Sequence, residues 1–167
     1  MRLATLLASI VIATAPMALA GCGDSGGAKH AKLTPGPMPE GESWTGVYFH
    51  PLYGYLHLQE EGTNIVGKWK TAHGDKWGEL SGTFNGNVFH YQWREHTVGL
   101  VGAAATKKGK GYFVYKLDKE QRPVIEGQYG LNDEEVGSDW TSMKQPRMQP
   151  DLKSIGGDSE GVPPSSF

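Results

Sequence analysis

The chain has 167 residues, with 16 lysines and arginines against 18 acidic residues, so its formal net charge is −2. This length predicts one domain, and the lack of a basic excess argues against a nucleic-acid partner. The 24 glycines, 5 Trp, 7 Tyr and 5 Phe favour an all-β domain of short strands joined by glycine-rich turns. Cys22 is the only cysteine, which excludes a disulfide within one chain.

The N-terminal residues have the three parts of a secretory signal. Arg2 gives a positive start, an apolar stretch covers residues 3–15, and small residues precede Cys22. The apolar stretch is shorter than the about 20 residues that a membrane-spanning helix needs. The segment therefore predicts export. One interpretation is an ordinary signal peptide followed by a chance cysteine, and the other is a signal peptide whose cleavage exposes Cys22 for modification.

Residues 19–22, Leu-Ala-Gly-Cys, resemble the lipobox of bacterial lipoproteins. The resemblance implies that residues 1–21 are a cleaved signal peptide and that Cys22 carries lipids, palmitate among them. Because each buried lipid CH₂ adds about 0.8 kcal/mol of membrane affinity, two or more chains anchor a protein stably. In enteric bacteria an aspartate after the cysteine retains a lipoprotein in the inner membrane. Gly23 stands there and Asp24 follows, which favours the outer membrane.

Two segments flank the predicted domain. Residues 22–43 contain Gly26-Gly27 and a proline-rich run over 34–39, without hydrophobic periodicity, and are predicted to form a lipidated, flexible tether. Residues 145–167 are also rich in proline and are predicted to be a disordered tail. The folded domain is therefore expected over residues 44–144.

An apolar residue, a glycine and an aromatic residue at alternate positions form a pattern that recurs in the domain. Its four copies lie at residues 44–48, 65–69, 80–84 and 125–129. Residues two apart share one face of a strand, so each copy predicts a half-buried strand with glycine at the centre of the buried face. Such glycines let strands bend sharply, as closed or strongly curved sheets require.

Turn signals between the apolar runs predict about eight strands. Asn85-Gly86-Asn87 is the strongest hairpin signal among them. Most connections are short, so neighbouring strands are expected to pair antiparallel, as an up-and-down β-barrel or a strongly curved sheet. The expected strands are Trp44–Tyr48, Tyr53–Gln59, Ile65–Thr71, Leu80–Phe84, Val88–Glu95, Gly111–Leu117, Val124–Tyr129 and Ser138–Met143.

The connection from Thr97 to Lys110 is longer than the others. Small and apolar residues come first, and Lys107, Lys108 and Lys110 follow. One interpretation is a long hairpin whose strands extend into this region. The other is a mobile flap over one mouth of the barrel, or a basic contact with lipid headgroups.

The late strands resemble those of calycins, the group that contains lipocalins and avidins. Residues 126–129, Glu-Gly-Gln-Tyr, followed by Trp140-Thr141, are similar to avidin-type barrels. The lipocalin Gly-x-Trp of the first strand is absent, because residues 46–48 read Gly-Val-Tyr. The polar residues that surround biotin in avidins have no counterparts here. The resemblance therefore implies a barrel and no particular ligand.

No catalytic site, cofactor or metal site is predicted. The chain has no Gly-x-Ser-x-Gly, P-loop or His-Glu-x-x-His motif. His90 and His96 share the expected polar face of one strand, which falls short of the three or four ligands that a metal needs. Glu95 with Glu126 or Asp139 is a conceivable carboxylate pair, although a solvated surface is the favoured interpretation.

Six aromatic residues on the predicted inner face are candidates for a ligand site. Side chains can fill an eight-stranded barrel, so a filled core is one interpretation. The other is an aromatic-lined cavity for a small hydrophobic ligand. The six residues are Tyr48, Trp69, Tyr91, Trp93, Tyr129 and Trp140.

Taken together, the sequence predicts a lipid-anchored lipoprotein of the bacterial envelope, with its domain in the periplasm or on the outer membrane. We expect a non-enzymatic structural or interaction module whose partners are the membrane and an envelope protein. The alternative is a lipocalin- or avidin-like binder of a small hydrophobic ligand. No nucleic-acid partner is expected.

Overall fold

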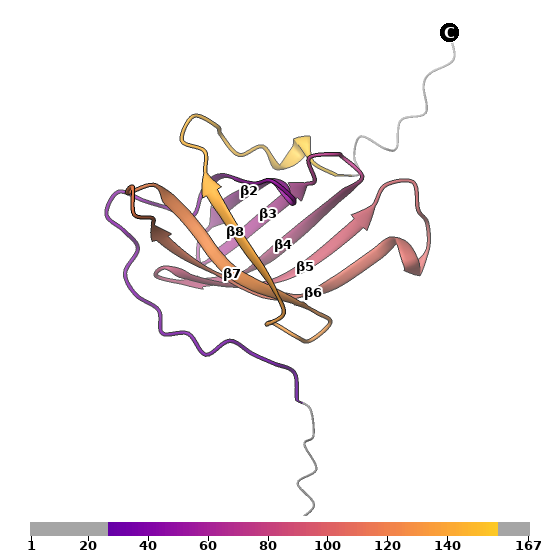
Figure 1. The fold of residues 1–167 in the computed structure, drawn as a ribbon, viewed down its shortest axis with the longest axis horizontal. Coiled ribbons are helices and arrows are strands. Elements are labelled where there is room, and N and C mark those ends of the chain that lie inside the picture. The colour runs from indigo at the N-terminus through magenta and orange to yellow at the C-terminus, as the bar shows by residue number, and fades with distance from the viewer. Residues whose placement is uncertain (1–26, 157–167) are drawn as a thin grey trace, which may run out of the picture.

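Eight antiparallel strands close into a barrel, and each pairs with its neighbours in sequence (Figure 1). This computed structural model describes residues 27–156, so the predicted signal peptide and the Cys22 lipidation site lie outside the described residues. The expected all-β, up-and-down barrel is confirmed. The strands are β1 (Gly46–His50), β2 (Gly54–Glu61), β3 (Asn64–Lys70), β4 (Lys76–Asn85), β5 (Val88–Thr97), β6 (Thr106–Leu117), β7 (Pro123–Leu131) and β8 (Ser138–Lys144).

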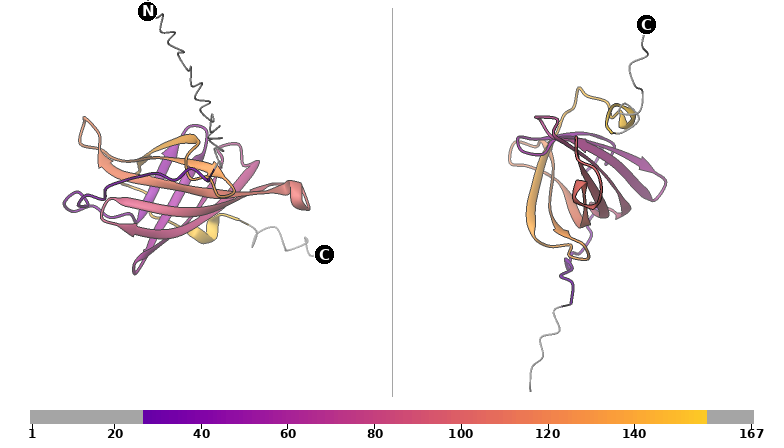
Figure 2. Two further views of the ribbon diagram at one scale, coloured as in Figure 1. Left: turned by 90° about the horizontal axis from the view of Figure 1, so that it is seen from below. Right: turned by 90° about the vertical axis from the view of Figure 1, so that its right-hand side faces the viewer.

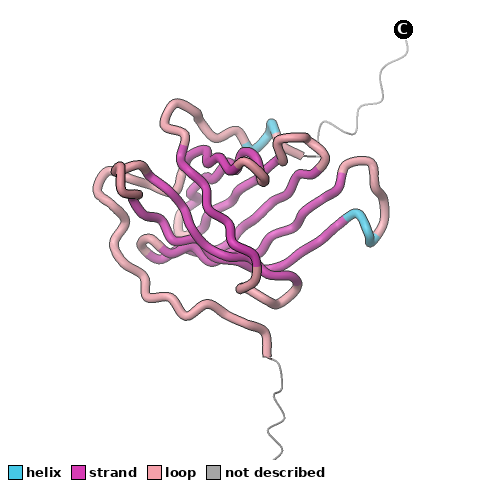
Figure 3. The backbone as a smooth tube through the Cα atoms, in the orientation of Figure 1, coloured by secondary structure: helices cyan, strands magenta, loops and turns pink. Residues whose placement is uncertain are grey.

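Within the described part of the chain, helix is confined to two short 3₁₀ turns, η1 (Ala103–Ala105) and η2 (Leu152–Ser154), which Figure 3 shows in cyan. Among residues 27–156, no helix has the length and apolar character to cross a membrane. The region around Thr97–Lys110 follows the first of its two interpretations, because β5 runs to Thr97 and β6 begins at Thr106. The resulting hairpin projects beyond the other loops (Figure 2).

The central glycines of the repeated pattern lie where adjacent strands approach closely. A Cβ atom at Gly82 would overlap the carbonyl oxygen of His90, and one at Gly127 would overlap that of Tyr112. Both carbonyl oxygens belong to the neighbouring strand. Any larger residue at these points would push the strands apart, so glycine permits the sheet curvature that closes the barrel.

The strand register gives the barrel two unlike ends. The β1–β2, β3–β4, β5–β6 and β7–β8 connections surround what we call the open end. At the closed end, Trp44 is fully buried and its Nε1–H donates to the carbonyl oxygen of Gly86 at 3.2 Å. The Trp44 ring packs edge-on against Phe89 and Tyr115, at centroid distances of 5.6 and 5.4 Å. These contacts plug that end with aromatic side chains.

The segments on both sides of the strands extend the ordered structure beyond the predicted domain of residues 44–144. Residues 27–43, expected as part of a flexible tether, lie extended along the outside of the barrel (Figure 1). The Gly36 N–H donates to Oδ1 of Asn87 at 2.7 Å. Residues 145–156, expected as part of a disordered tail, also pack on the barrel, where Ile155 is buried. Composition did not reveal this order because it arises from bonds between backbone groups and distant side chains.

Candidate functional site

The open end of the barrel contains a pocket of about 430 Å³, which we call the open-end pocket. The β1–β2 and β3–β4 connections line one part of it, and the inner faces of β5, β6 and β7 line another, together with Lys76 of β4 and Ser138 of β8. This volume lies within the roughly 300–1,000 Å³ that small-molecule sites occupy. One end of the barrel is thus plugged and the other is hollow.

Three aromatic residues form the inner wall of the open-end pocket. The hydroxyl groups of Tyr53 and Tyr129 lie 3.1 Å apart, and Tyr53 also donates to the Asp139 carbonyl oxygen at 3.4 Å. Trp93 packs edge-on against Tyr129 at a centroid distance of 5.7 Å. Its Nε1–H donates to the carbonyl oxygen of Gly130 at 3.1 Å, which fixes the indole orientation. The wall therefore presents ordered rings to an incoming ligand.

The Tyr53 hydroxyl in this wall stays protonated over the physiological range. Burial raises the pKa of Tyr53 well above its usual value, and the hydrogen bond with Tyr129 raises it further. Because Tyr53 donates to the Asp139 carbonyl oxygen, the geometry favours Tyr129 as the donor between the two hydroxyls. The two hydroxyls add hydrogen-bonding groups to the pocket.

Charged side chains line the pocket between the aromatic wall and the mouth of the barrel. Lys76 pairs with Glu95 at 3.3 Å across β4 and β5. Lys107 on β6 also lines the open-end pocket, and in residues 27–156 it forms no ion pair. Its ammonium group is therefore available to a ligand that carries negative charge.

The structure divides the six predicted aromatic residues between the core and the pocket. Trp93 and Tyr129 line the open-end pocket. Tyr48 lies toward the closed end, where its hydroxyl donates to the Trp44 carbonyl oxygen at 2.8 Å. The other three, Trp69, Tyr91 and Trp140, are buried in the middle of the barrel. The closed end and the middle of the barrel thus form a filled core, and the aromatic-lined cavity lies at the open end.

Three residues of the open-end pocket were not predicted from the sequence to line a ligand site. Glu95 continues the inward alternation that contains Trp93, so the strand period carried a signal for it. On β6, Lys107 lies two residues before the inward-facing Gly109, so the same alternation indicates that Lys107 faces inward. Tyr53 lies in a connection, where no such period applies, and only the folded chain brings it to the pocket.

The considered carboxylate pair does not form. Glu95 faces the open-end pocket, whereas Glu126 and Asp139 line a groove on the outside of the barrel. Glu126 pairs there with Lys116 at 2.5 Å, and the Asp139 carboxylate accepts from an amide side chain. Within the described range 27–156, no group of three or more His, Cys, Asp or Glu side chains is arranged to hold a metal ion.

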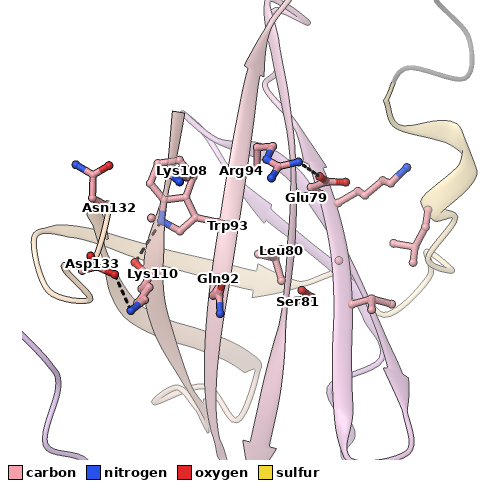
Figure 4. Close-up of a pocket in the computed structure, with 15 residues that line it drawn as sticks. Glu79, Leu80, Ser81, Gln92, Trp93, Arg94, Lys108, Lys110, Asn132 and Asp133 are labelled. Carbon is pink, nitrogen blue, oxygen red and sulfur yellow. Dashed lines mark hydrogen bonds and ion pairs between the residues drawn. The ribbon is translucent and has the colours of Figure 1, made fainter. Parts of the chain in front are cut away.

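A second hollow of about 450 Å³ lies on the outer face of β3 to β6, and we call it the outer groove (Figure 4). Two of its cationic side chains are paired, Arg94 with Glu79 at 3.7 Å and Lys110 with Asp133 at 2.9 Å. Lys68 and Lys108 line the same groove and form no ion pair in residues 27–156. Trp93 is the one aromatic residue in the lining of the outer groove, whereas three aromatic rings line the open-end pocket, so the open-end pocket is the stronger candidate site for a ring-bearing ligand.

No protein family matches the chain, and neither does any curated protein or solved structure in the comparisons. The candidate site therefore rests on the geometry of the barrel.

Proposed function

We propose that the protein is a lipid-anchored, non-enzymatic binding protein of the bacterial envelope. Its open-end pocket takes a small ligand with a flat aromatic or apolar body and an anionic group. The observation that carries the proposal is the contrast between the two barrel ends. Trp44 plugs one end, and the other holds a 430 Å³ pocket with ordered rings and the ammonium of Lys107, which forms no ion pair with residues 27–156.

The lining chemistry supports this choice of ligand. A flat ring fits against the indole of Trp93, whose position is fixed by its hydrogen bond to the Gly130 carbonyl oxygen. A carboxylate, sulfonate or phosphate group would meet Lys107 at the pocket rim. The purely structural module that the sequence also predicts does not require such a pocket, so the geometry favours ligand binding.

The membrane anchor is the second part of the proposal and rests on the Leu-Ala-Gly-Cys run at residues 19–22. Cys22→Ser removes the acylated sulfur, so the variant should leave the membrane fraction after a salt wash while the wild-type protein stays. A variant that still sediments with membranes would refute the anchor.

Ligand binding is tested first by native mass spectrometry of the protein purified from its own envelope fraction. We expect a non-covalent mass that leaves on denaturation. Anilinonaphthalene sulfonate, an aromatic anion, is a second probe whose fluorescence should rise in the wild-type protein. Lys107→Met should weaken its binding, and Lys119→Met, an exposed lysine in the β6–β7 turn, should not. A clean apo mass together with equal dye binding by both variants would refute the proposed site.

A further inference from the structure

Exposed apolar side chains gather around the open end of the barrel. Such residues are normal when scattered singly over a surface. Here Leu52 is 73% exposed in the β1–β2 connection, and Leu131 is 54% exposed at the end of β7. Val98, Leu100 and Val101 lie in the projecting β5–β6 connection, and Val101 is 94% exposed. Two connections and the end of β7 thus present apolar groups to the surroundings at one end of the barrel.

The N-terminal segment leaves the barrel at this same end. The Lys29 N–H donates to the Glu134 carboxylate at 2.8 Å, and the Glu135 N–H donates to the Lys29 carbonyl oxygen at 2.9 Å. Glu134 and Glu135 belong to the β7–β8 connection, which borders the open end. The chain that precedes Lys29, including Cys22, therefore starts from the open end.

The length of that chain limits how the barrel can sit on a membrane. Lys29 is seven positions after Cys22, and this stretch spans at most about 25 Å when fully extended. Gly36 is likewise seven positions after Lys29, and it bonds to Asn87 at the closed end. The closed end would thus reach the bilayer only with the linker almost fully stretched. The open end reaches it with the linker relaxed.

Basic residues lie directly behind the apolar tip. Lys107 and Lys108 follow the β5–β6 connection on β6, and neither forms an ion pair among the described residues. Lys108 lies near Asp133, whose carboxylate pairs with Lys110. An apolar tip backed by lysines is the arrangement that inserts into the boundary between headgroups and acyl chains, while its cations meet anionic headgroups.

From these observations we propose that the open end of the barrel docks on the phospholipid bilayer. The β5–β6 tip inserts through Val98, Leu100 and Val101, and Leu52 and Leu131 lie at the membrane surface. The open-end pocket then faces the bilayer, and the closed end points away from it. This inference rests on the proposed anchor at Cys22, because the short linker is what holds this end at the membrane.

The test uses the full acylated chain in vesicles of phosphatidylethanolamine and phosphatidylglycerol. Because Cys22 is acylated in this material, Val101→Cys provides a single free thiol for an environment-sensitive fluorophore. Lys119→Cys, in the exposed β6–β7 turn at the closed end, is the matched control. We expect the label at 101 to emit at shorter wavelength and to be quenched by a nitroxide-bearing lipid, and the label at 119 to do neither.

The outcomes separate the docking from the anchor. If the protein floats with the vesicles but the label at 101 stays in water, or the label at 119 is quenched instead, the docking is wrong and the anchor stands. If the protein does not float and Cys22 itself takes the label, both are wrong. A second variant, Leu100→Ser with Val101→Ser, should still float and fold, because both side chains are exposed, but a label at Val98→Cys should then lose its quenching.

Discussion

The Nδ1–H of His90 on β5 donates a hydrogen bond to Oε1 of Glu135 in the β7–β8 connection. Glu135 is only 7% exposed. Its second carboxylate oxygen accepts from the Ala31 N–H at 2.9 Å, and its own N–H donates to the Lys29 carbonyl oxygen at 2.9 Å. This one residue therefore joins the barrel wall to the N-terminal segment and fixes where that segment leaves the open end.

Glu135→Gln should loosen the N-terminal segment. A glutamine side chain is uncharged and has one accepting oxygen, so the charge-assisted bonds to His90 and Ala31 are lost, and only a His90 tautomer with an unprotonated Nδ1 could accept from the new NH₂ group. We expect a loss of about 1–3 kcal/mol in the free energy of unfolding and faster hydrogen exchange at the Ala31 amide. Glu120→Gln, in an exposed turn at the closed end, is the control. Unchanged exchange at Ala31 would show that Glu135 does not hold the segment.

Tyr91→Phe should stabilise the barrel. The Tyr91 hydroxyl is buried and has no hydrogen-bond partner among the described residues. Removing it should raise the free energy of unfolding by about 1 kcal/mol, because the cost of an unsatisfied buried group disappears. Tyr48→Phe is the matched comparison and should lose about 1 kcal/mol, because it deletes the bond to the Trp44 carbonyl oxygen. Denaturant unfolding measures both, and a destabilised Tyr91→Phe would mean that its hydroxyl has a partner.

Gly127→Ala should destabilise the barrel strongly. The added methyl group would overlap the Tyr112 carbonyl oxygen on β6, so the two paired strands would have to separate. Overpacking of this kind costs about 1–3 kcal/mol or more. Gln128→Ala, the neighbouring residue on the outer face of β7, should cost much less. If the two variants unfold at the same denaturant concentration, the close approach of the strands is not essential.

The barrel should lose stability in alkaline solution. Burial raises the pKa of Tyr48, Tyr91 and Tyr115 above the usual 10.0. Unfolded phenols lose their protons near pH 10, while the folded barrel keeps them, so above that pH the unfolded state binds fewer protons and stability falls. Tyrosinate absorbance should therefore rise together with the loss of near-ultraviolet circular dichroism. Ionisation of these three tyrosines in a barrel with an unchanged spectrum would contradict the prediction.

The sequence predicted the strands best where the alternation of apolar and polar residues was unbroken. β4 and β6 begin earlier than expected, at Lys76 and Thr106, because Gly78 and Gly109 interrupt the apolar pattern on their inner faces. In the folded barrel, the ring of Trp69 lies over Gly78 and that of Trp93 lies over Gly109. The space on the inner face of each glycine is filled by a side chain of the neighbouring strand. The apolar pattern of a single strand therefore does not reveal that the glycine belongs to the buried face.

The candidate site was predictable only in part for a related reason. Trp93 and Tyr129 follow from strand alternation, and both line the open-end pocket. Tyr53 reaches the pocket from a connection, and Glu135 binds Ala31 across most of the chain. Contacts of this kind depend on the closed barrel, so local sequence patterns carry no signal for them.

The barrel closes through a narrow seam in which β1 and β8 share two residue pairs, Tyr48 with Lys144 and Phe49 with Met143. A bond of 2.7 Å from the Gln145 N–H to the Val47 carbonyl oxygen extends it. The free edge of β1 is therefore paired only after β8, the last strand of the barrel, has been synthesised. Until then that edge is open to other chains. Because this pairing joins the most distant strands, seam closure should be the slow, late step of folding and the point most sensitive to truncation after β7.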